Sequence, residues 1–284
     1  MIRLVASDLD GTIIGSDNNI FENNLKAIND INNKNIDFVI CTGKTYPMMK
    51  KICSQFNASY GIFGNGNQII NLKTGKEIYK KLLTTSEINT CIEVAKAHNL
   101  HLHLYTNNEI ITEELKYMDL RNYKLQQNKY YDTSLQITIV DNLYQYLQFN
   151  NPEVSKLIIS SDNNLSNIKN EILDKQNLSI TTIKKRGEYK DKVINKEYEY
   201  LDITPKNINK STALNILRNY LNVDNNEIMA VGDNLNDLDM VKNSGIGVAV
   251  ANAYDELKQV AKYTTVNSVD NGGFAEAVYK FIEF

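Results

Sequence analysis

The sequence lacks three features that would assign it to a specialised class of protein: a cysteine framework, an excess of basic residues and a long apolar run. Its three cysteines, Cys41, Cys53 and Cys91, are odd in number and show no CxxC spacing, which argues against a disulfide scaffold. A formal charge of −3 provides no basic surface for nucleic acid or an anionic membrane. No apolar stretch reaches the length of about 18 residues that a membrane-spanning helix needs.

The first residues, MIRLVASDLDG, reach charged side chains almost at once and contain no apolar run of signal-peptide length. We therefore expect a reduced, soluble, cytoplasmic protein, a monomer or weak homo-oligomer, with no nucleic-acid or membrane partner. What the chain does contain is ordinary for a globular protein, with 42% apolar and 23% charged residues. Its 284 residues suffice for one large domain or two modest ones.

The first part of the chain alternates apolar runs of strand length with helical periodicity. The predicted elements are a strand at 4–7, a helix around Ile28, a strand at 36–41, a helix at 47–56 and a strand at 60–63. Continuous apolar runs are typical of strands buried on both faces of a parallel sheet. The βαβαβ order therefore predicts a parallel sheet with right-handed crossovers.

The middle of the chain has a different pattern. Leucine and histidine alternate over residues 100–104, which predicts a half-buried strand. Further strands are predicted at 135–140, 156–160, 178–183 and 198–203. One-sided alternation favours an open sheet with helices on one face.

From residue 205 onward the buried α/β pattern returns. It predicts a helix at 210–220, a strand at 227–231, a helix around Leu238 and a strand at 246–250. The simplest organisation is an α/β core, residues 1–83 and 203–284, interrupted by an inserted α+β domain at residues 84–202.

The strongest local signal is the sequence DLDGT at residues 8–12, directly after the first predicted strand. Side chains two apart on an extended chain point the same way, so Asp8 and Asp10 can converge at the carboxyl end of the strand. Open α/β sheets bind their ligands at that end. Gly11 lets the chain turn away tightly. The alternative is an ordinary turn, in which Asp and Gly are common.

A second acidic segment, residues 232–237, follows the strand predicted at 227–231. It brings Asp233 and Asp237 to the same edge of the sheet as Asp8 and Asp10. Four gathered carboxylates repel one another and raise their pKa values unless a cation lies among them. Hard oxygen ligands of this kind favour Mg²⁺. A loop followed by a helix N-cap is the alternative.

Two smaller features complete the set. Thr42 and Gly43 follow the strand at 36–41 and offer a hydroxyl and backbone N–H groups to an anion. Lys210 opens a predicted helix. Each has an ordinary alternative, since Thr-Gly is a common turn and a lone lysine is usually a surface residue.

Three histidines, His98, His101 and His103, raise the alternative of a transition-metal site. Only His101 and His103 would share a strand face, and no neighbouring cysteine or acidic cluster completes a tetrahedron. An exposed or substrate-facing strand surface is the favoured interpretation.

In their order along the chain, these motifs resemble the haloacid dehalogenase (HAD) superfamily phosphatases of the Cof type, subclass IIB, with a C2-type cap inserted before the lysine motif. The matching segments are 8–12, 41–43, 65–66, 209–214 and 232–240, and segments 248–253 and 270–273 are also similar. The resemblance implies a Rossmann-like parallel-sheet core and an α+β cap that reads the leaving group.

The resemblance also implies roles for individual residues. Asp8 is the nucleophile, and Asp10 is the acid that protonates the leaving alcohol and the base that later activates water. The residues implied to bind phosphate are Thr42, Gly43, Lys210 and Asn236. Those implied to hold Mg²⁺ are Asp8, Asp10 through its backbone carbonyl, Asp233 and Asp237. Further possible substrate contacts are Gly11, Lys44, Asn65 and Gly66.

One position departs from the family pattern. Family members often carry Arg after the Thr-Gly pair, where this chain has Lys44. A lysine presents a point charge instead of a planar fork, so a bidentate substrate contact is missing. This change affects the identity of the substrate more than the reaction type.

The implied function is hydrolysis of small phosphorylated metabolites, with sugar phosphates favoured, through an aspartyl-phosphate on Asp8 with Mg²⁺ as cofactor. Three alternatives stay open at this point. One is a phosphomutase, in which the aspartyl-phosphate hydrolyses slowly. The second is a phosphometabolite-binding regulator without turnover, which is disfavoured by the intact set of Asp8, Asp10, Thr42, Lys210 and Asp233. The third is a phospho-accepting receiver, which the inserted domain and the loop at 232–237 disfavour.

Overall fold

The computed structural model describes residues 1–15, 19–106, 109–115, 136–186 and 197–284. Within these ranges the chain divides into two units. The first comprises residues 1–80 and 208–284, and the second comprises the described residues of 81–115 and 136–207. These limits lie a few residues from the junctions predicted from the sequence.

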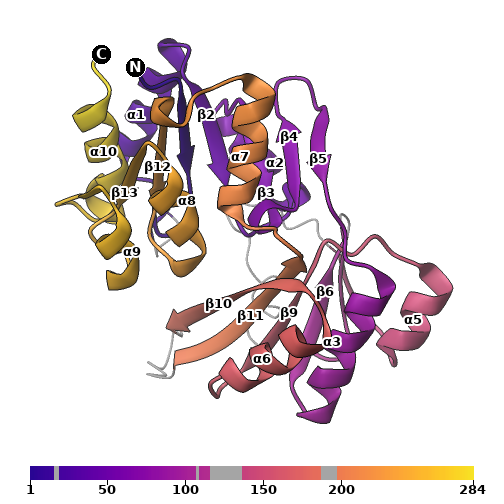
Figure 1. Cartoon of the computed structure of the whole chain (residues 1–284). Helices are drawn as coiled ribbons and strands as arrows, with labels where there is room; N and C mark the ends of the chain where they lie inside the picture. The colour runs from indigo at the N-terminus through magenta and orange to yellow at the C-terminus, as the bar shows by residue number, and fades with distance from the viewer. Residues whose placement is uncertain (16–18, 107–108, 116–135, 187–196) are drawn as a thin grey trace. The chain divides into compact units, whose positions relative to one another are not determined.

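The first unit is built on one sheet, whose strand order is β14-β13-β12-β1-β2-β3-β4-β5 (Figure 1). Neighbours from β14 to β3 are parallel, and β4 and β5 extend the sheet as antiparallel strands. The bounds are β1 Leu4–Ser7, β2 Asp37–Cys41, β3 Tyr60–Phe63, β4 Gln68–Asn71, β5 Glu77–Lys80, β12 Ile228–Gly232, β13 Ile246–Ala249 and β14 Tyr263–Thr264. The predicted parallel-sheet core is confirmed.

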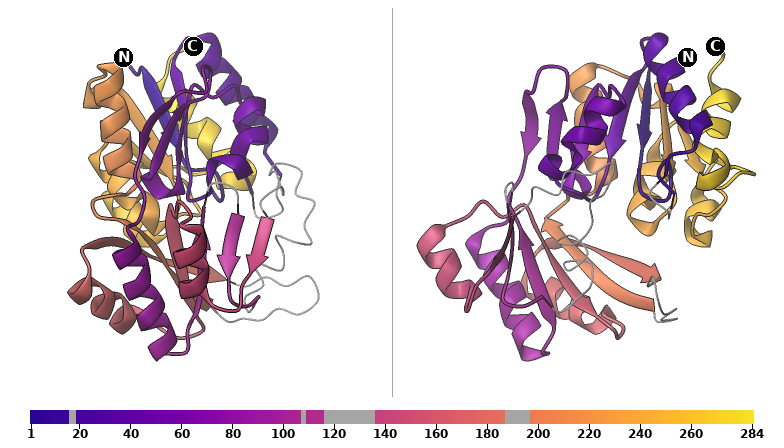
Figure 2. Two further views of the ribbon diagram at one scale, coloured as in Figure 1. Left: turned by 90° about the vertical axis from the view of Figure 1, so that its right-hand side faces the viewer. Right: turned by 180° about the vertical axis from the view of Figure 1, so that it is seen from behind.

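Helices cover both faces of this sheet, which explains why its central strands are apolar on both sides. They are α1 Glu22–Asn33, α2 Tyr46–Gln55, α7 Lys210–Leu221, α8 Leu238–Asn243, α9 Asp255–Val260 and α10 Gly273–Phe281. On one face, Leu217 of α7 and Met240 of α8 pack with Ala6 of β1. On the other, the ring of Phe38 lies 6.0 Å from that of Phe274 in α10. Figure 2 shows α7 and α8 on the opposite side of the sheet from α1 and α10.

The beginning of α7 is fixed by its own sequence and by a glycine. Asn209 caps the helix, accepting the N–H of Thr212 at 2.8 Å, while the Thr212 hydroxyl accepts the N–H of Asn209 at 3.0 Å. Gly66 has a φ of +115°, and a Cβ there would lie 2.4 Å from the carbonyl oxygen of Asn209. Only glycine permits this approach. Together these contacts hold the first turn, which carries Lys210.

The second unit contains a mixed sheet in the order β10-β11-β9-β6-β7-β8. Its strands are β6 His101–Tyr105, β7 Glu109–Thr112, β8 Gln136–Ile139, β9 Lys156–Ser161, β10 Leu178–Arg186 and β11 Glu197–Pro205. Its helices are α3 Thr85–Ala97, α5 Leu143–Asn150 and α6 Ser166–Lys175. Side chains of these helices pack with Leu102, Leu157 and Leu201 on one face of the sheet, as predicted. Leu135, at the start of one predicted strand, lies outside the described residues.

The prediction of a half-buried strand at 100–104 is wrong. His101 and His103 are 2% and 5% exposed, although they share the face opposite the helices. Polar groups on this face contact one another: the two imidazole rings lie 5.4 Å apart, and Lys156 pairs with Asp202 at 2.7 Å. A polar strand face can therefore be buried. Burial, with His101 and Lys156 nearby, holds the pKa of His103 well below its usual value, so its imidazole is neutral.

Each helix in the described ranges is too short or too polar to cross a bilayer.

Candidate active site

The candidate site lies where neighbouring parallel strands of the first unit end. β1 ends at Ser7 and is followed by Asp8, β2 is followed by Thr42, and β12 ends at Gly232 and is followed by Asp233. β1 pairs in parallel with both β2 and β12. The carboxyl ends of all three strands therefore meet at one edge, as the motif positions predict.

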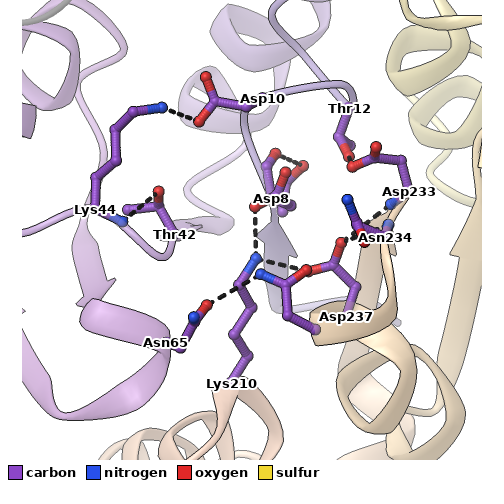
Figure 3. A network of polar contacts seen from close by, with 12 residues as sticks. Asp8, Asp10, Thr12, Thr42, Lys44, Asn65, Lys210, Asp233, Asn234 and Asp237 are labelled. Atoms are coloured by element: carbon purple, nitrogen blue, oxygen red, sulfur yellow. Dashed lines mark hydrogen bonds and ion pairs between the residues drawn. The ribbon is translucent and has the colours of Figure 1, made fainter. Parts of the chain in front are cut away.

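Lys210 reaches this edge from the first turn of α7 and is fully buried (Figure 3). Its Nζ lies 2.5 Å from Asp8 Oδ1 and 2.6 Å from Asp237 Oδ1. Burial alone would lower the pKa of Lys210, but the carboxylates of Asp237 and Asp8 raise it above its ordinary value. The ammonium group therefore stays charged in the interior, where an unpaired lysine would be costly.

Three buried carboxylates cluster at this edge, and two of them contact the single ammonium group of Lys210. Asp8, Asp233 and Asp237 each offer an oxygen within 4.8 Å of the other two. Burial raises the pKa of Asp8 to about 7; Lys210 opposes the rise, while Asp237 and Asp10 add to it. Burial, followed by the charges of Asp8 and Asp237, also raises the pKa of Asp233. The site is therefore short of positive charge.

This donor set fits a hard divalent cation such as Mg²⁺. All three side chains present carboxylate oxygens, and a bound cation would offset the mutual repulsion of the three carboxylates. The turn after β1 adds backbone close to Asp233: a Cβ at Gly11 would lie 2.4 Å from Asp233 Oδ2, and Gly11 has a φ of +90°. The Thr12 hydroxyl donates to Asp233 Oδ1 at 3.0 Å.

Asp237 differs from the other two carboxylates because protein donors occupy both of its oxygens. Oδ1 accepts from Lys210, and Oδ2 accepts the backbone N–H groups of Asp233 and Asn234, each at 3.1 Å. Asp237 is therefore better suited to orient Lys210 and the loop after β12 than to bind a cation directly.

Asp10 lies apart from the three buried carboxylates. Its side chain is about half exposed, at 47%, and its carboxylate pairs with the ammonium group of Lys44 (Figure 3). The backbone N–H of Lys44 donates to the Thr42 hydroxyl at 3.1 Å. Lys44 thus connects Asp10 to the loop that follows β2.

Two asparagines join the remaining predicted residues. Asn236 donates from Nδ2 to Asn65 Oδ1 at 3.0 Å, and the Asn65 N–H donates to the carbonyl of Thr42 at 3.0 Å. A Cβ at Gly43 would lie 3.2 Å from Asn65 Oδ1. The structure therefore brings Thr42, Gly43, Asn65 and Asn236 together. Gly66, in contrast, lies against the backbone at the start of α7.

Two polar side chains of the site were not predicted. Thr12 belongs to the DLDGT motif, but the sequence does not show that its hydroxyl binds Asp233. Asn252 donates from Nδ2 to the carbonyl of Gly11 at 2.8 Å. It stands in the segment 248–253 that resembles the family, but no sequence signal pairs it with a residue 241 positions away.

The chain matches a known protein family along most of its length. The sequence profile of the haloacid dehalogenase-like hydrolases matches residues 5–278. The chain is 27% identical to the 5-amino-6-(5-phospho-D-ribitylamino)uracil phosphatase YcsE of Bacillus subtilis, over 95% of this chain and 92% of that protein.

Solved structures share the fold of this chain along nearly its whole length. A phosphatase of the HAD superfamily from Bacteroides thetaiotaomicron superposes with a TM-score of 0.79 at 23% identity, covering 99% of this chain and 95% of that chain. A sugar phosphatase of HAD subclass IIB superposes with a TM-score of 0.77 at 17% identity, covering 98% of each chain. At these identities the structures establish a common fold.

Proposed function

The chain belongs to the haloacid dehalogenase-like hydrolases, and we propose that it is a magnesium-dependent phosphatase of small phosphorylated metabolites that forms a transient phosphoryl bond on Asp8. The observation that carries this proposal is the convergence of Asp8 and Lys210, 2.5 Å apart, within a buried acidic cluster at the carboxyl edge of the sheet. A carboxylate held beside a fixed ammonium group is suited to attack a phosphorus atom whose oxygen charge needs neutralising.

In the first step, a carboxylate oxygen of Asp8 bonds to phosphorus while the bond from phosphorus to the ester oxygen breaks. The leaving oxygen takes a proton from Asp10. Because Asp10 is about half exposed and lies outside the buried cluster, its carboxyl can exchange protons with solvent and reach a leaving group.

In the second step, water attacks phosphorus and the bond to Asp8 breaks, which releases inorganic phosphate. Asp10, now ionised, takes the proton from the attacking water. One carboxyl can serve as acid and then base because the two proton transfers are successive.

Lys210, the Thr42 hydroxyl and the backbone at Gly43 would hold the phosphoryl oxygens, and Asn236 with Asn65 would support that pocket. Asp8, Asp233 and the carbonyl of Asp10 would hold Mg²⁺, with Asp237 orienting Lys210 and the loop. When bound, Mg²⁺ supplies charge neutralisation on the phosphoryl oxygens.

Sugar phosphates and related small metabolites are the proposed substrates. This rests on the names of similar proteins, one a phosphatase of a phosphorylated ribityl compound and another a sugar phosphatase. We further propose that the inserted domain, predicted at residues 84–202, is the cap that selects the leaving group, and that the enzyme works in the cytoplasm.

The test is phosphate release from a panel of sugar phosphates and one aryl phosphate, with Mg²⁺ and with chelator. Asp8→Asn removes the nucleophile while keeping its shape. Asp255→Asn is the matched control, because the Asp255 side chain is 89% exposed and pairs only loosely with Lys258, at 3.7 Å.

Release that needs Mg²⁺, disappears in Asp8→Asn and persists in Asp255→Asn supports the proposal. If the folded wild-type protein binds Mg²⁺ but releases no phosphate from any compound, the phosphatase assignment is wrong.

A further inference from the structure

The turn that carries Asp10 is held from outside the catalytic cluster by two asparagine side chains. Asn252, in the turn after β13, donates from Nδ2 to the carbonyl of Gly11 at 2.8 Å, and its Oδ1 accepts the N–H of Val269 at 2.8 Å. Asn24, in the first turn of α1, donates from Nδ2 to the carbonyls of Ile13 and Val269, at 3.4 Å each.

Both asparagines therefore bond to the backbone of the same residue, Val269. Asn252 accepts a hydrogen bond from the N–H of Val269, and Asn24 donates one to the carbonyl of Val269. Asn24 Oδ1 also accepts the N–H of Ala275 in α10, at 3.0 Å. Val269 is buried. The turn after β1 is thus tied at two points, Gly11 and Ile13, to one anchor in the C-terminal segment.

The two asparagines differ in burial, and this separates their roles. Asn24 is fully buried, and its amide satisfies several backbone groups, so it is part of the folded core. Asn252 is exposed, yet both ends of its amide are engaged with backbone groups distant in the sequence. An exposed side chain contributes little to the core, so its two bonds act mainly on the position of the segments they join.

The segment held by Asn252 is the one that contacts Asp233. Gly11 packs against the Asp233 carboxylate, with a hypothetical Cβ 2.4 Å from Oδ2, and Thr12 donates to Oδ1 at 3.0 Å. The backbone also joins the segment that follows Asn252 to the loop after β12, because the N–H of Tyr254 donates to the carbonyl of Asp233 at 2.9 Å. A shift of the Gly11 peptide would therefore move both Asp10 and the carboxylate of Asp233.

We propose that Asn252 is a positioning residue. Its amide holds the Gly11 carbonyl, and this contact keeps the turn formed by residues 10–12 in place against Asp233. This inference rests on the proposed function for its catalytic readout. Asparagine is required because the position needs one donor and one acceptor in a short side chain. Aspartate keeps the acceptor for Val269 but places a carboxylate against the Gly11 carbonyl.

The experiment compares Asn252→Ala and Asn252→Asp with the wild-type protein. Asn271→Ala is the matched control: Asn271 is also exposed, lies in the same C-terminal segment, and bonds through its side chain to neighbouring Ser268 at 3.2 Å. Three quantities are measured: kcat and KM, the affinity for Mg²⁺ without substrate by calorimetry, and the melting temperature of the metal-free protein.

We expect both Asn252 variants to lose about 10- to 100-fold in kcat with less than about threefold change in KM, since small displacements of catalytic groups cost rate. Asn252→Ala should bind Mg²⁺ about 3- to 10-fold more weakly, the factor that one lost hydrogen bond gives. Its melting temperature should fall no further than that of Asn271→Ala. The control should keep wild-type kcat and Mg²⁺ affinity.

Wild-type kcat and Mg²⁺ affinity in Asn252→Ala would overturn the proposal, and so would equal losses in Asn271→Ala. If Asn252→Ala does not fold, Asn252→Asp carries the kinetic test. If the wild-type protein releases no phosphate at all, the proposed function fails, but the Mg²⁺ affinities still decide whether Asn252 positions the turn.

Discussion

At the scale of single residues, the site depends on one ammonium group buried among carboxylates. Lys210→Met removes that charge and leaves Asp8 and Asp237 without the donor that lies 2.5 and 2.6 Å from them. We expect kcat to fall about 10²- to 10³-fold and the metal-free protein to lose about 3–5 kcal/mol of stability. Phosphate release and urea unfolding measure the two effects.

Lys175→Met is the control for this change, since Lys175 makes an exposed ion pair with Glu171 on α6 and exposed pairs contribute little. A Lys210→Met variant with wild-type kcat would show that the ammonium group does not act on the reacting phosphoryl group. Lys210→Arg should not restore activity, because a planar guanidinium cannot replace a compact ammonium in a fully buried position.

The raised pKa of Asp8 predicts how stability depends on pH. Burial raises the folded-state pKa to about 7 from an ordinary value of 3.8, so between these values the folded chain binds more protons than the unfolded chain. Stability of the metal-free protein should therefore decline as the pH rises from about 4 to about 7 and then level off. Urea unfolding across this range in chelator measures the decline.

Asp8→Asn should make the decline of stability with pH less steep, because the titrating group is gone. Asp233, whose pKa is also raised, should keep part of that decline. Mg²⁺ should stabilise the wild-type protein more at pH 8 than at pH 5, since the cation binds ionised carboxylates. Stability that rises with pH over the same window would contradict the assigned direction of the Asp8 shift.

Residue positions were predictable where they follow from strand ends, and not where they follow from contacts across the chain. Asp8, Thr42 and Asp233 each come directly after a buried strand, so the parallel sheet brings them together by itself. The pairing of Lys44 with Asp10 and the bond from Asn252 to Gly11 depend on how loops return to the site. No periodicity in the sequence records such contacts.

At the scale of elements, the conformation of the turn after β1 and its contact with Asp233 require glycine at residue 11. Gly11→Ala forces a side chain into a backbone with φ of +90° and places its Cβ 2.4 Å from Asp233 Oδ2. We expect at least about a 10-fold loss of Mg²⁺ affinity and of kcat, because the carboxylate must move. Calorimetric Mg²⁺ titration and steady-state kinetics measure the loss.

Gly75→Ala separates the two effects in that prediction. Gly75 also has a positive φ, +73°, but a Cβ there would meet nothing within 4 Å. It should therefore lose about 1 kcal/mol of stability from backbone strain alone and keep wild-type Mg²⁺ affinity. Equal Mg²⁺ affinity in the two variants would show that the contact with Asp233 does not matter.

The buried parallel strands at the centre of the first unit were the most predictable elements. The predicted strands at 4–7 and 60–63 match β1 and β3, because buried parallel strands are apolar runs with clear ends. Strands β4, β5, β7 and β14 were not predicted. Of these, β5 carries Glu77 and Lys80 at the sheet edge, and β14 has two residues. The burial of β6 was missed because alternating histidines mimic a solvated face when their partners lie on other strands.

At the scale of the whole molecule, the sequence predicted two parts because its hydrophobic pattern changes near residue 84 and returns after residue 205. Each part has its own apolar cluster, one around Leu4, Ala6 and Leu217 and the other around Leu104 and Leu157. Sequence pattern could locate this change but could not show the buried pairing of Lys156 with Asp202, since either residue alone resembles a solvated charge.

Separate cores predict separate unfolding transitions, one for each unit. The clustered carboxylates of Asp8, Asp233 and Asp237 all belong to the first unit. Mg²⁺ should therefore raise only the stability of that unit, by about 2.7 kcal/mol when its concentration is 100 times the dissociation constant.

Lys156→Met should lower only the other transition, since it leaves Asp202, 3% exposed, without its ammonium partner. Breaking such a buried pair costs about 3–5 kcal/mol. Differential scanning calorimetry of the full chain measures both shifts, and a single transition that responds equally to Mg²⁺ and to Lys156→Met would show that the two units unfold as one.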